Sequence, residues 1–344
     1  MEKKKRIPMP ARYLINGVLL AAFLLLFNAL IGSGAISGYW NTILMLIGIN
    51  IILTVSLNIS TGYLGQLPLG HAGFMAVGGY AAGIFMKSVP LDGTLSFVLG
   101  ILLAGVVAAI FGFIIGIPAL RLKGDYLAII TLGFGEIIRV VLLNIDSVLG
   151  FTFTGGAAGL LSIPKHVNFL NIFLCVILTC AVIHMLMKSR HGRAILSIRE
   201  NEIAAESCGI NTTYYKTLGF VVSAFFAGVA GALFAGYLGL MVPKDFGFMR
   251  SIEILVMVVL GGMGSMVGSV ISAAVLTMVP YLLQSISPAV ADYRMVIYSL
   301  LLIAVMIFKP SGLMGTYDFS LSRLLEKALN RLSGGKKEKG GAGQ

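Results

Sequence analysis

Two groups of charged residues interrupt an otherwise apolar chain, and they are the first candidates for chemistry. The segment from Lys188 to Asn211, KSRHGRAILSIRENEIAAESCGIN, mixes Lys, Arg and His with three Glu residues. Glu136 and Arg139 lie three residues apart inside an apolar run, so their side chains share a helix face and can pair. Groups of this kind can dock a partner or line a pathway.

The pair Glu136 and Arg139 has two interpretations. Ionisable residues within a membrane span are energetically costly and mark either a pathway or an internal partner. Counted from Asp125, the pair falls in the outer half of its span. It either lines an external vestibule or a contact with a partner, or it is a self-neutralised structural pair. The sequence leaves both open.

No arrangement typical of catalysis, nucleotide binding or metal binding occurs in the sequence. It has no GxxxxGK[ST] loop to hold nucleotide phosphates and no HExxH metal motif. Cys175, Cys180 and Cys208 do not have the spacing of a disulfide framework or a metal site. We therefore expect no enzymatic activity, metal or cofactor of the chain's own.

The charged segment also has the pattern of a short amphipathic helix. Gly209 is a natural stop, because glycine adopts the left-handed conformation that ends helices, and Asn211 can cap the next helix. The segment is either a plain connection between two spans or a docking element for a cytoplasmic partner. Its apolar stripe consists of Ala194, Ile195, Ile198 and Ala205.

The composition places these groups in a membrane protein. The 344 residues are 58% hydrophobic and only 11% charged, whereas soluble domains carry roughly 25% charged residues. The net charge of +11 comes from bases at the N-terminus, the 188–212 segment and the tail. That distribution fits the positive-inside rule and argues against nucleic acid as a partner. MEKKKR and the span after it are expected to form an anchor, not a cleaved signal.

Hydropathy and charge predict an all-α polytopic bundle of about ten spans. Residues 1–12 form a basic cytoplasmic N-terminus, 13–308 the transmembrane domain and 309–344 a basic cytoplasmic tail. Residues 144–166 form the longest outer loop. Ten crossings place segment 188–212 and both termini in the cytoplasm, as their Lys and Arg require. The expected spans are 13–31, 39–59, 71–86, 95–120, 125–143, 167–187, 214–238, a short one at 251–260, 266–283 and 293–308.

Two Gly-rich stretches predict broken helices at corresponding places. One is residues 62–70, before a helix that starts near His71, and the other is Gly261 to Ser265. Paired breaks of this kind point to a transport pathway, although Gly-rich membrane helices also resemble one another by chance. The candidate pathway residues at the breaks are Gly65, Gln66, Pro68, His71, Gly261, Gly262, Gly264 and Ser265.

Five stretches together resemble one family. They are GYLGQLPLGHAGF (62–74), ALRLKGDYLAIITLGFGEIIRVV (119–141), FTGGAAGL (153–160), GRAILSIRENEIAAESCGI (192–210) and ILVMVVLGGMGSMVGSVISA (254–273). They are similar to permease subunits of bacterial ABC importers for branched-chain amino acids. LKGDYLAIITLGFGE is closer to the LivM-type subunit than to its LivH-type companion. TGGAAG departs from the TGGPNG that this family often carries.

The resemblance implies a heteromeric importer in the bacterial inner membrane. It implies a LivH-type second permease, two ATPase subunits that bind the ATP, and an extracytoplasmic solute-binding protein that delivers leucine, isoleucine or valine. A permease of a related urea or amide importer and a secondary amino-acid transporter are the alternatives. In the family the 188–212 segment contacts the ATPase, which implies coupling roles for Arg193, Arg199, Glu202, Ala204, Ala205, Glu206 and Gly209.

Overall fold

The computed structural model describes residues 22, 24–89, 93–122, 124–151 and 153–286, with positions 293, 296, 299–300, 303–304, 307–308 and 312–313. Residues Tyr39–Thr316 form one unit, and Met1–Gly38 with Tyr317–Gln344 form another, in which residues 24–32 are helical. The predicted spans 13–31 and 293–308 lie about half outside the described residues, and the termini 1–12 and 314–344 lie wholly outside them.

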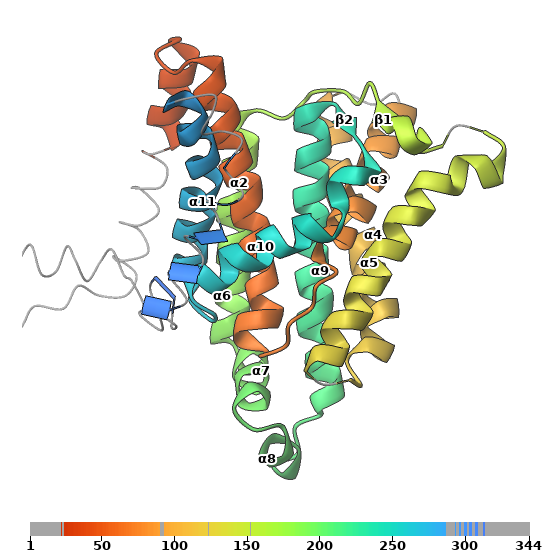
Figure 1. Ribbon diagram of the computed structural model, residues 1–344, viewed down its shortest axis with the longest axis vertical. Coiled ribbons are helices and arrows are strands. Elements are labelled where there is room, and N and C mark those ends of the chain that lie inside the picture. Colours follow the sequence, from red (N-terminus) through yellow and green to blue (C-terminus); the bar gives the residue numbers. More distant parts are fainter. Residues whose placement is uncertain are drawn as a thin grey trace, which may run out of the picture. The chain divides into compact units, whose positions relative to one another are not determined.

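The larger unit is almost entirely helical, as the sequence predicts (Figure 1). The one departure from an all-α fold, within the described residues, is a short antiparallel pair of strands, Leu160–Leu161 (β1) and Leu240–Met241 (β2). The main helices are α2 (Gly38–Asn58), α3 (His71–Ser88), α4 (Gly93–Ala119), α5 (Asp125–Leu149), α6 (Phe169–Lys188), α7 (Arg190–Glu200), α8 (Glu202–Ser207), α9 (Thr212–Leu238), α10 (Phe248–Gly261) and α11 (Met266–Ile286).

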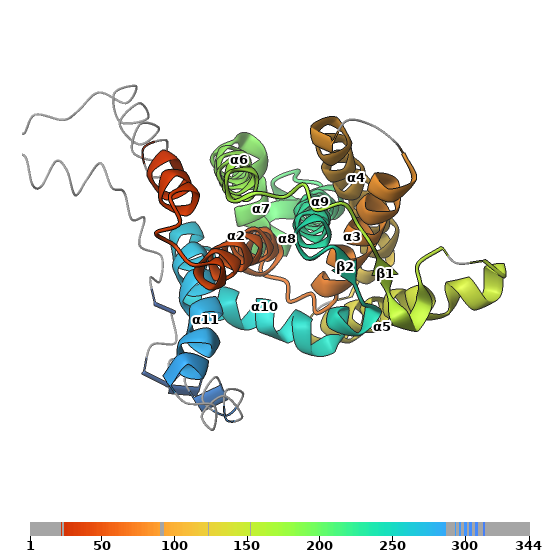
Figure 2. The ribbon, with the colours of Figure 1, turned by 90° about the horizontal axis from the view of Figure 1, so that it is seen from above.

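Five of the described helices are long and apolar enough to cross a membrane: α2 with the turn that follows it, α4, α5, α6 and α9. Helix α3 is more polar, but most of its side chains are buried among α4, α5 and α9 (Figure 2). With 14 residues, α10 is shorter than the ~20 that a full crossing needs. It runs obliquely across the long helices, and the extended stretch that contains β2 precedes it (Figure 1).

Small residues hold the centre of the unit together. A Cβ on Gly78 of α3 would overlap the backbone of Gly228 of α9, and a Cβ on Gly231 would overlap the carbonyl of Met75. Ala104 of α4 lies against Gly228 from the other side. Backbones approach this closely only where no side chain intervenes, which is how helices associate in lipid.

Both predicted breaks are present. Helix α2 passes into a π-helical turn, Ile59–Tyr63 (η1), and an irregular stretch then leads to α3, which starts at His71 as expected. Helix α10 ends at Gly261 and α11 begins at Met266, and both Gly262 and Gly264 have positive φ. The Gly-rich sequence therefore located both breaks within a residue or two.

The 188–212 segment forms two helices, where the sequence predicted one. Asn201 is extended (φ −159°, ψ 109°) and separates α7 from α8. Its side-chain oxygen accepts a hydrogen bond from Ala204 N at 3.1 Å, so Asn201 caps α8 in preference to continuing α7. The predicted stop is confirmed, because Gly209 has φ +81° and Ile210 N donates to the carbonyl of Ala205.

The predicted outer loop is shorter at its start than expected. Helix α5 continues to Leu149, beyond the predicted end at 143, and stops at Gly150 (φ 74°). Asp146 in its last turns accepts hydrogen bonds from Phe153 N (2.9 Å) and Thr154 N (2.7 Å). The carboxylate therefore folds the TGGAAG stretch back against the end of α5.

Candidate functional site

The two breaks meet each other at the end of α7. Arg199 Nη1 donates to the carbonyl of Gly62 at 2.7 Å. A Cβ on Gly264 would lie 3.0 Å from Arg199 Nη1, and one on Gly65 would lie 3.1 Å from Arg199 Cγ. One side chain of the 188–212 segment thus touches the break after α2 and the break after α10.

Asn58 ties the breaks together directly. Its Oδ1 accepts from Gly264 N at 2.9 Å, and its Nδ2 donates to Ser265 O at 3.2 Å and to Ser269 Oγ at 2.9 Å. There is no room for a side chain on Gly62, because a Cβ would overlap both Asn58 Oδ1 and Gly264 N. We call Asn58, Gly62, Arg199, Gly264 and Ser265 the junction.

Helix α8 is fixed to the start of α9 by its acidic residues. Glu202 Oε1 pairs with Lys216 Nζ at 2.5 Å, and Glu206 Oε1 accepts from Thr212 Oγ1 at 2.7 Å. The Lys216 side chain is only 6% exposed, so this ion pair is partly shielded from water. Glu202 and Glu206, which the sequence predicts to act in coupling, therefore have a structural role, which is to hold α8 in place.

The solvent-exposed side of α8 is small and includes apolar residues. Ala205 is buried as the stripe predicted, whereas Ala204, Gly209 and Cys208 are exposed, and Ile203 is 74% exposed. Helices α7 and α8 extend past the lower ends of the long helices (Figure 1). Ile203 lies off the apolar stripe, and that mismatch in the sequence would have identified it as a surface residue.

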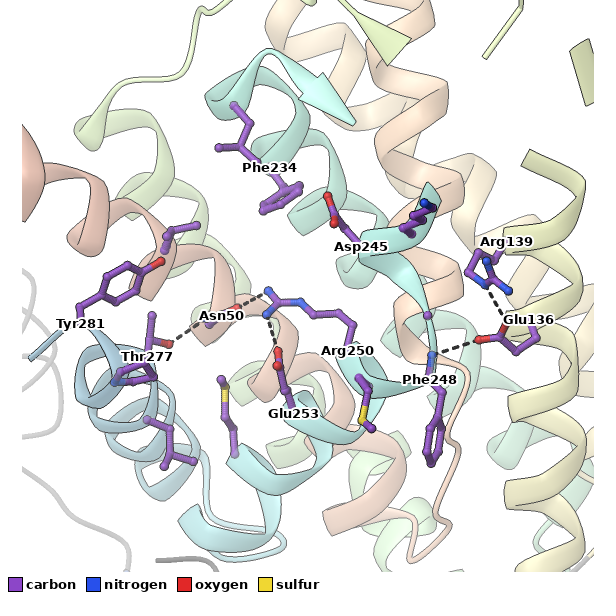
Figure 3. A pocket seen from close by; sticks show the side chains of 18 residues that line it. Asn50, Glu136, Arg139, Phe234, Asp245, Phe248, Arg250, Glu253, Thr277 and Tyr281 are labelled. Atoms are coloured by element: carbon purple, nitrogen blue, oxygen red, sulfur yellow. Dashed lines mark hydrogen bonds and ion pairs between the residues drawn. The ribbon is translucent and has the colours of Figure 1, made fainter. Parts of the chain in front are cut away.

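A second site is a cavity of about 780 Å³ between α2, α5, α9, α10 and α11 (Figure 3). Arg250 projects into its centre, where Nη2 donates to Asn50 Oδ1 at 2.8 Å and Nη1 pairs with Glu253 Oε2 at 3.0 Å. Asn50 Nδ2 donates in turn to Thr277 Oγ1 at 2.8 Å. The guanidinium is thus held by residues of α2 and α10, and Thr277 of α11 holds Asn50 in turn.

The predicted pair Glu136 and Arg139 lies on the far rim of the same cavity. The pair is formed, with Arg139 Nε 2.7 Å from Glu136 Oε2. Glu136 Oε1 also accepts from Phe248 N at 3.0 Å, so the carboxylate caps the first turn of α10. The pair lines the cavity and also fastens α10 to α5.

The other predicted residues are distributed around these two sites. His71 is buried and its Nε2 lies 3.0 Å from Ser56 Oγ, away from the cavity and the junction. Pro68 is buried in the irregular stretch, where Leu69 N donates to Thr131 Oγ1 of α5. Gln66 belongs to the same stretch, and Gly261 packs against the backbone of Gly268. Arg193 is exposed on α7.

Sequence reasoning missed the polar centre of the cavity. Arg250 and Glu253 have the same i,i+3 spacing as the Glu136 and Arg139 pair, and they stand where a long uncharged stretch begins. That spacing could have identified them. Asn50 and Thr277 carry no such signal, because isolated polar residues within spans are common and only their contact across helices gives them a role.

Comparison with known proteins agrees with the resemblance. Residues 39–306 match the family described as branched-chain amino acid transport system, permease component. The chain is 37% identical over 300 residues to the high-affinity branched-chain amino acid transport system permease protein LivM of Salmonella typhimurium. The aligned region covers 77% of this chain and 68% of that protein. It is 35% identical over 129 residues to LivH of Escherichia coli, or 37% of this chain and 40% of that protein.

The solved structure of PsaBC from Streptococcus pneumoniae in complex with Fab aligns with 83% of this chain and 97% of that chain. The sequence identity between the two chains is 14%, and the TM-score of the alignment is 0.42.

Proposed function

The chain belongs to the family of branched-chain amino acid transport permeases, and we propose that it is a permease subunit through which leucine, isoleucine and valine enter the cell. It is a membrane protein with several apolar helices of spanning length. The substrates are inferred from the family. The broken helices expose backbone N–H and C=O groups, which a pathway through lipid requires.

The proposed assembly contains four further subunits. The partial similarity to LivH supports a second permease of that kind, beside which this chain would form the path. Two ATPases and an extracytoplasmic solute-binding protein complete the proposed importer. ATP is hydrolysed on the ATPases, so this chain needs no nucleotide site.

The contact of Arg199 with Gly62 is the observation that best supports coupling. Helices α7 and α8 extend past the ends of the long helices (Figure 1), and Arg199 reaches from the end of α7 to both breaks. A partner that moves α7 would pull on the carbonyl of Gly62 and would press on Gly264. A plain connecting loop needs no such contact with the pathway helices.

We propose the ten-crossing topology with α7, α8 and both termini in the cytoplasm. The excess of Lys and Arg near α7 supports that side. The oblique path of α10 also supports it. The chain passes from the end of α9 beside β1 to the junction beside Arg199, a route that needs no full-length helix.

Uptake measurements test this function. A strain that lacks the protein should lose high-affinity, ATP-dependent uptake of labelled leucine at low external concentration, and the gene in trans should restore it. In the intact strain, excess isoleucine or valine should compete.

The deletion strain could instead take up leucine normally and lose urea or short-amide uptake. That result would mean that the proposed substrates are wrong and the proposed importer class is right. Transport of leucine by the purified chain without any ATPase would mean that the class is wrong.

A further inference from the structure

The cavity beside α10 has the size and lining of a binding site for a small amphipathic molecule. Its volume of about 780 Å³ lies within the range of roughly 300–1,000 Å³ that small-molecule sites occupy. One part of the wall is charged, and the other is apolar, formed by Leu46, Phe234, Leu238, Met257, Leu276 and Pro280.

Arg250 is held ready for an anion. Its two hydrogen bonds, to Asn50 Oδ1 and Glu253 Oε2, are the ones the described residues make with its guanidinium. A guanidinium has five N–H donors in a rigid plane, which match the two oxygens of a carboxylate. Three N–H donors of the Arg250 guanidinium thus remain for a ligand. Asn50 fixes the position of the guanidinium, because Asn50 is only 5% exposed and is itself bonded to Thr277.

Glu253 supplies the opposite charge beside it. The bond to Arg250 uses one carboxylate oxygen, Oε2, and the side chain is 34% exposed. Glu136, on the far rim, has both oxygens engaged, one by Arg139 and the other by Phe248 N. Of the two acidic side chains with i,i+3 partners in this cavity, Glu253 is therefore the one with an oxygen to offer.

We propose that this cavity binds the amino acid in transit, with Arg250 on its carboxylate, Glu253 on its ammonium group and the apolar wall around its side chain. This inference rests on the proposed function and adds the residues that hold the substrate. Arg250 and Glu253 neutralise each other when the cavity is empty. A zwitterion can insert between them without leaving a net charge away from water.

The same balance predicts selectivity. A ligand with only a carboxylate would bring a net negative charge into the cavity, and one with only an ammonium group would bring a net positive charge. An uncompensated charge that is partly removed from water is costly. We therefore expect leucine to bind, whereas 4-methylpentanoate, which lacks the amino group, and isopentylamine, which lacks the carboxylate, do not.

Protection of a cysteine from labelling tests the site in the assembled importer without its binding protein. Cys175, Cys180 and Cys208 are replaced by serine, and Met249→Cys places a thiol at an exposed lining position. The rate of maleimide labelling is measured against the concentration of leucine, 4-methylpentanoate or isopentylamine. Leucine should slow labelling and the two singly charged analogues should not.

Substitutions at Arg250 and Glu253 then identify the groups that bind. Arg250→Gln and Glu253→Gln should each raise the half-protecting leucine concentration roughly tenfold or more, the factor for losing one charge-assisted hydrogen bond. Arg121→Gln, the same change at an exposed arginine that does not line the cavity, should leave protection unchanged. Equal labelling rates without ligand show that each variant retains the cavity. If Arg250→Gln changes the labelling rate without ligand, the half-protecting leucine concentration of the nearly isosteric Glu253→Gln is the test of the site.

The site assignment is wrong if leucine gives no protection, if both analogues protect as well as leucine, or if protection survives both Gln substitutions at 250 and 253. Leucine uptake by the unaltered importer with its binding protein is measured in parallel. Uptake without protection overturns this site and leaves the proposed function standing. Absence of leucine uptake counts against the proposed function itself.

Discussion

Two arginines in this mostly apolar chain are used in opposite ways. Arg199 bonds to a backbone carbonyl, that of Gly62, at a place where glycines leave no room for side chains. Among the described residues, Arg250 bonds to side chains, those of Asn50 and Glu253, and it projects into a cavity. Each therefore connects elements that are distant in sequence, but one meets packed backbone and the other meets open space.

This difference separates transmission of movement from recognition. The bond from Arg199 to the carbonyl of Gly62 lies where the glycines leave little room for a ligand, so a displacement of Arg199 pulls on the chain at Gly62. Bonds to side chains beside a cavity can rearrange around a ligand at modest cost. We infer that the junction is built for mechanical linkage and the cavity for binding, and the predictions below test that division.

The largest effect is expected from filling the junction. Gly62→Ala would place a Cβ on Asn58 Oδ1 and on the backbone of Gly264, neither of which can rotate away freely. Overpacking of this kind costs about 1–3 kcal/mol or more, so we expect loss of leucine uptake together with a lower melting temperature of the purified importer. Gly133→Ala is the matched control, because a Cβ there meets nothing within 4 Å. Wild-type uptake by Gly62→Ala would show that the junction is not closely packed.

The next largest effect is expected at Arg199. Arg199→Gln removes the charged donor to Gly62, and uptake should fall roughly tenfold, the factor for one hydrogen bond from a charged donor. Insertion should be normal, and ATP hydrolysis should no longer respond to loaded binding protein. Arg190→Gln, an exposed change on the same helix, should leave both activities intact. Unchanged stimulation of hydrolysis in Arg199→Gln would rule out the linkage.

A smaller effect is expected at the end of α8. Gly209 has φ +81°, a conformation that costs a side-chain-bearing residue about 1–2 kcal/mol. Gly209→Val should therefore loosen α8 and reduce uptake several-fold with normal protein levels in the membrane. Gly209→Asn should be milder, because Asn tolerates this conformation. Equal uptake by the two variants would show that the geometry of this turn does not matter to coupling.

The smallest effect on uptake is expected from a variant that shows by thiol labelling on which side of the membrane α8 lies. In a variant with Cys175 and Cys180 replaced by serine, the exposed Cys208 is the remaining thiol and uptake should be unchanged. An impermeant maleimide should label it in inside-out vesicles and not in intact cells. Labelling from outside would contradict both the ten-crossing topology and a cytoplasmic docking role for α8.

Much of the fold followed from local patterns in the sequence. Apolar runs located the described spanning helices to within a few residues, except at the end of α5, and the glycines located both breaks. The stop at Gly209 and the cap at Asn211 were predictable because they depend on residues within one turn. The break at Asn201 was missed because an asparagine in a polar helix signals a cap only when its side chain is seen to bond forward.

The sites were predictable only in part. The i,i+3 pair of Glu136 and Arg139 forms as expected, since both partners lie on one helix. Glu202 and Arg199 were identified as important, but their bonds to Lys216 and Gly62 cross between elements and left no sign in the sequence. The Arg250 cluster draws on α2, α10 and α11, so no single stretch could reveal it.

The sequence by itself determined the family, the membrane setting and the places where helices start, end and break. These depend on hydropathy and backbone preference, which act over a few residues. Only the tertiary structure decided that the two breaks meet at Asn58 and Arg199, and that Asn50, Arg250 and Glu253 face one cavity. The contacts of Asn58 with Gly264, of Arg199 with Gly62 and of Arg250 with Asn50 join residues far apart in the chain, so they depend on how the helices pack and not on the local sequence.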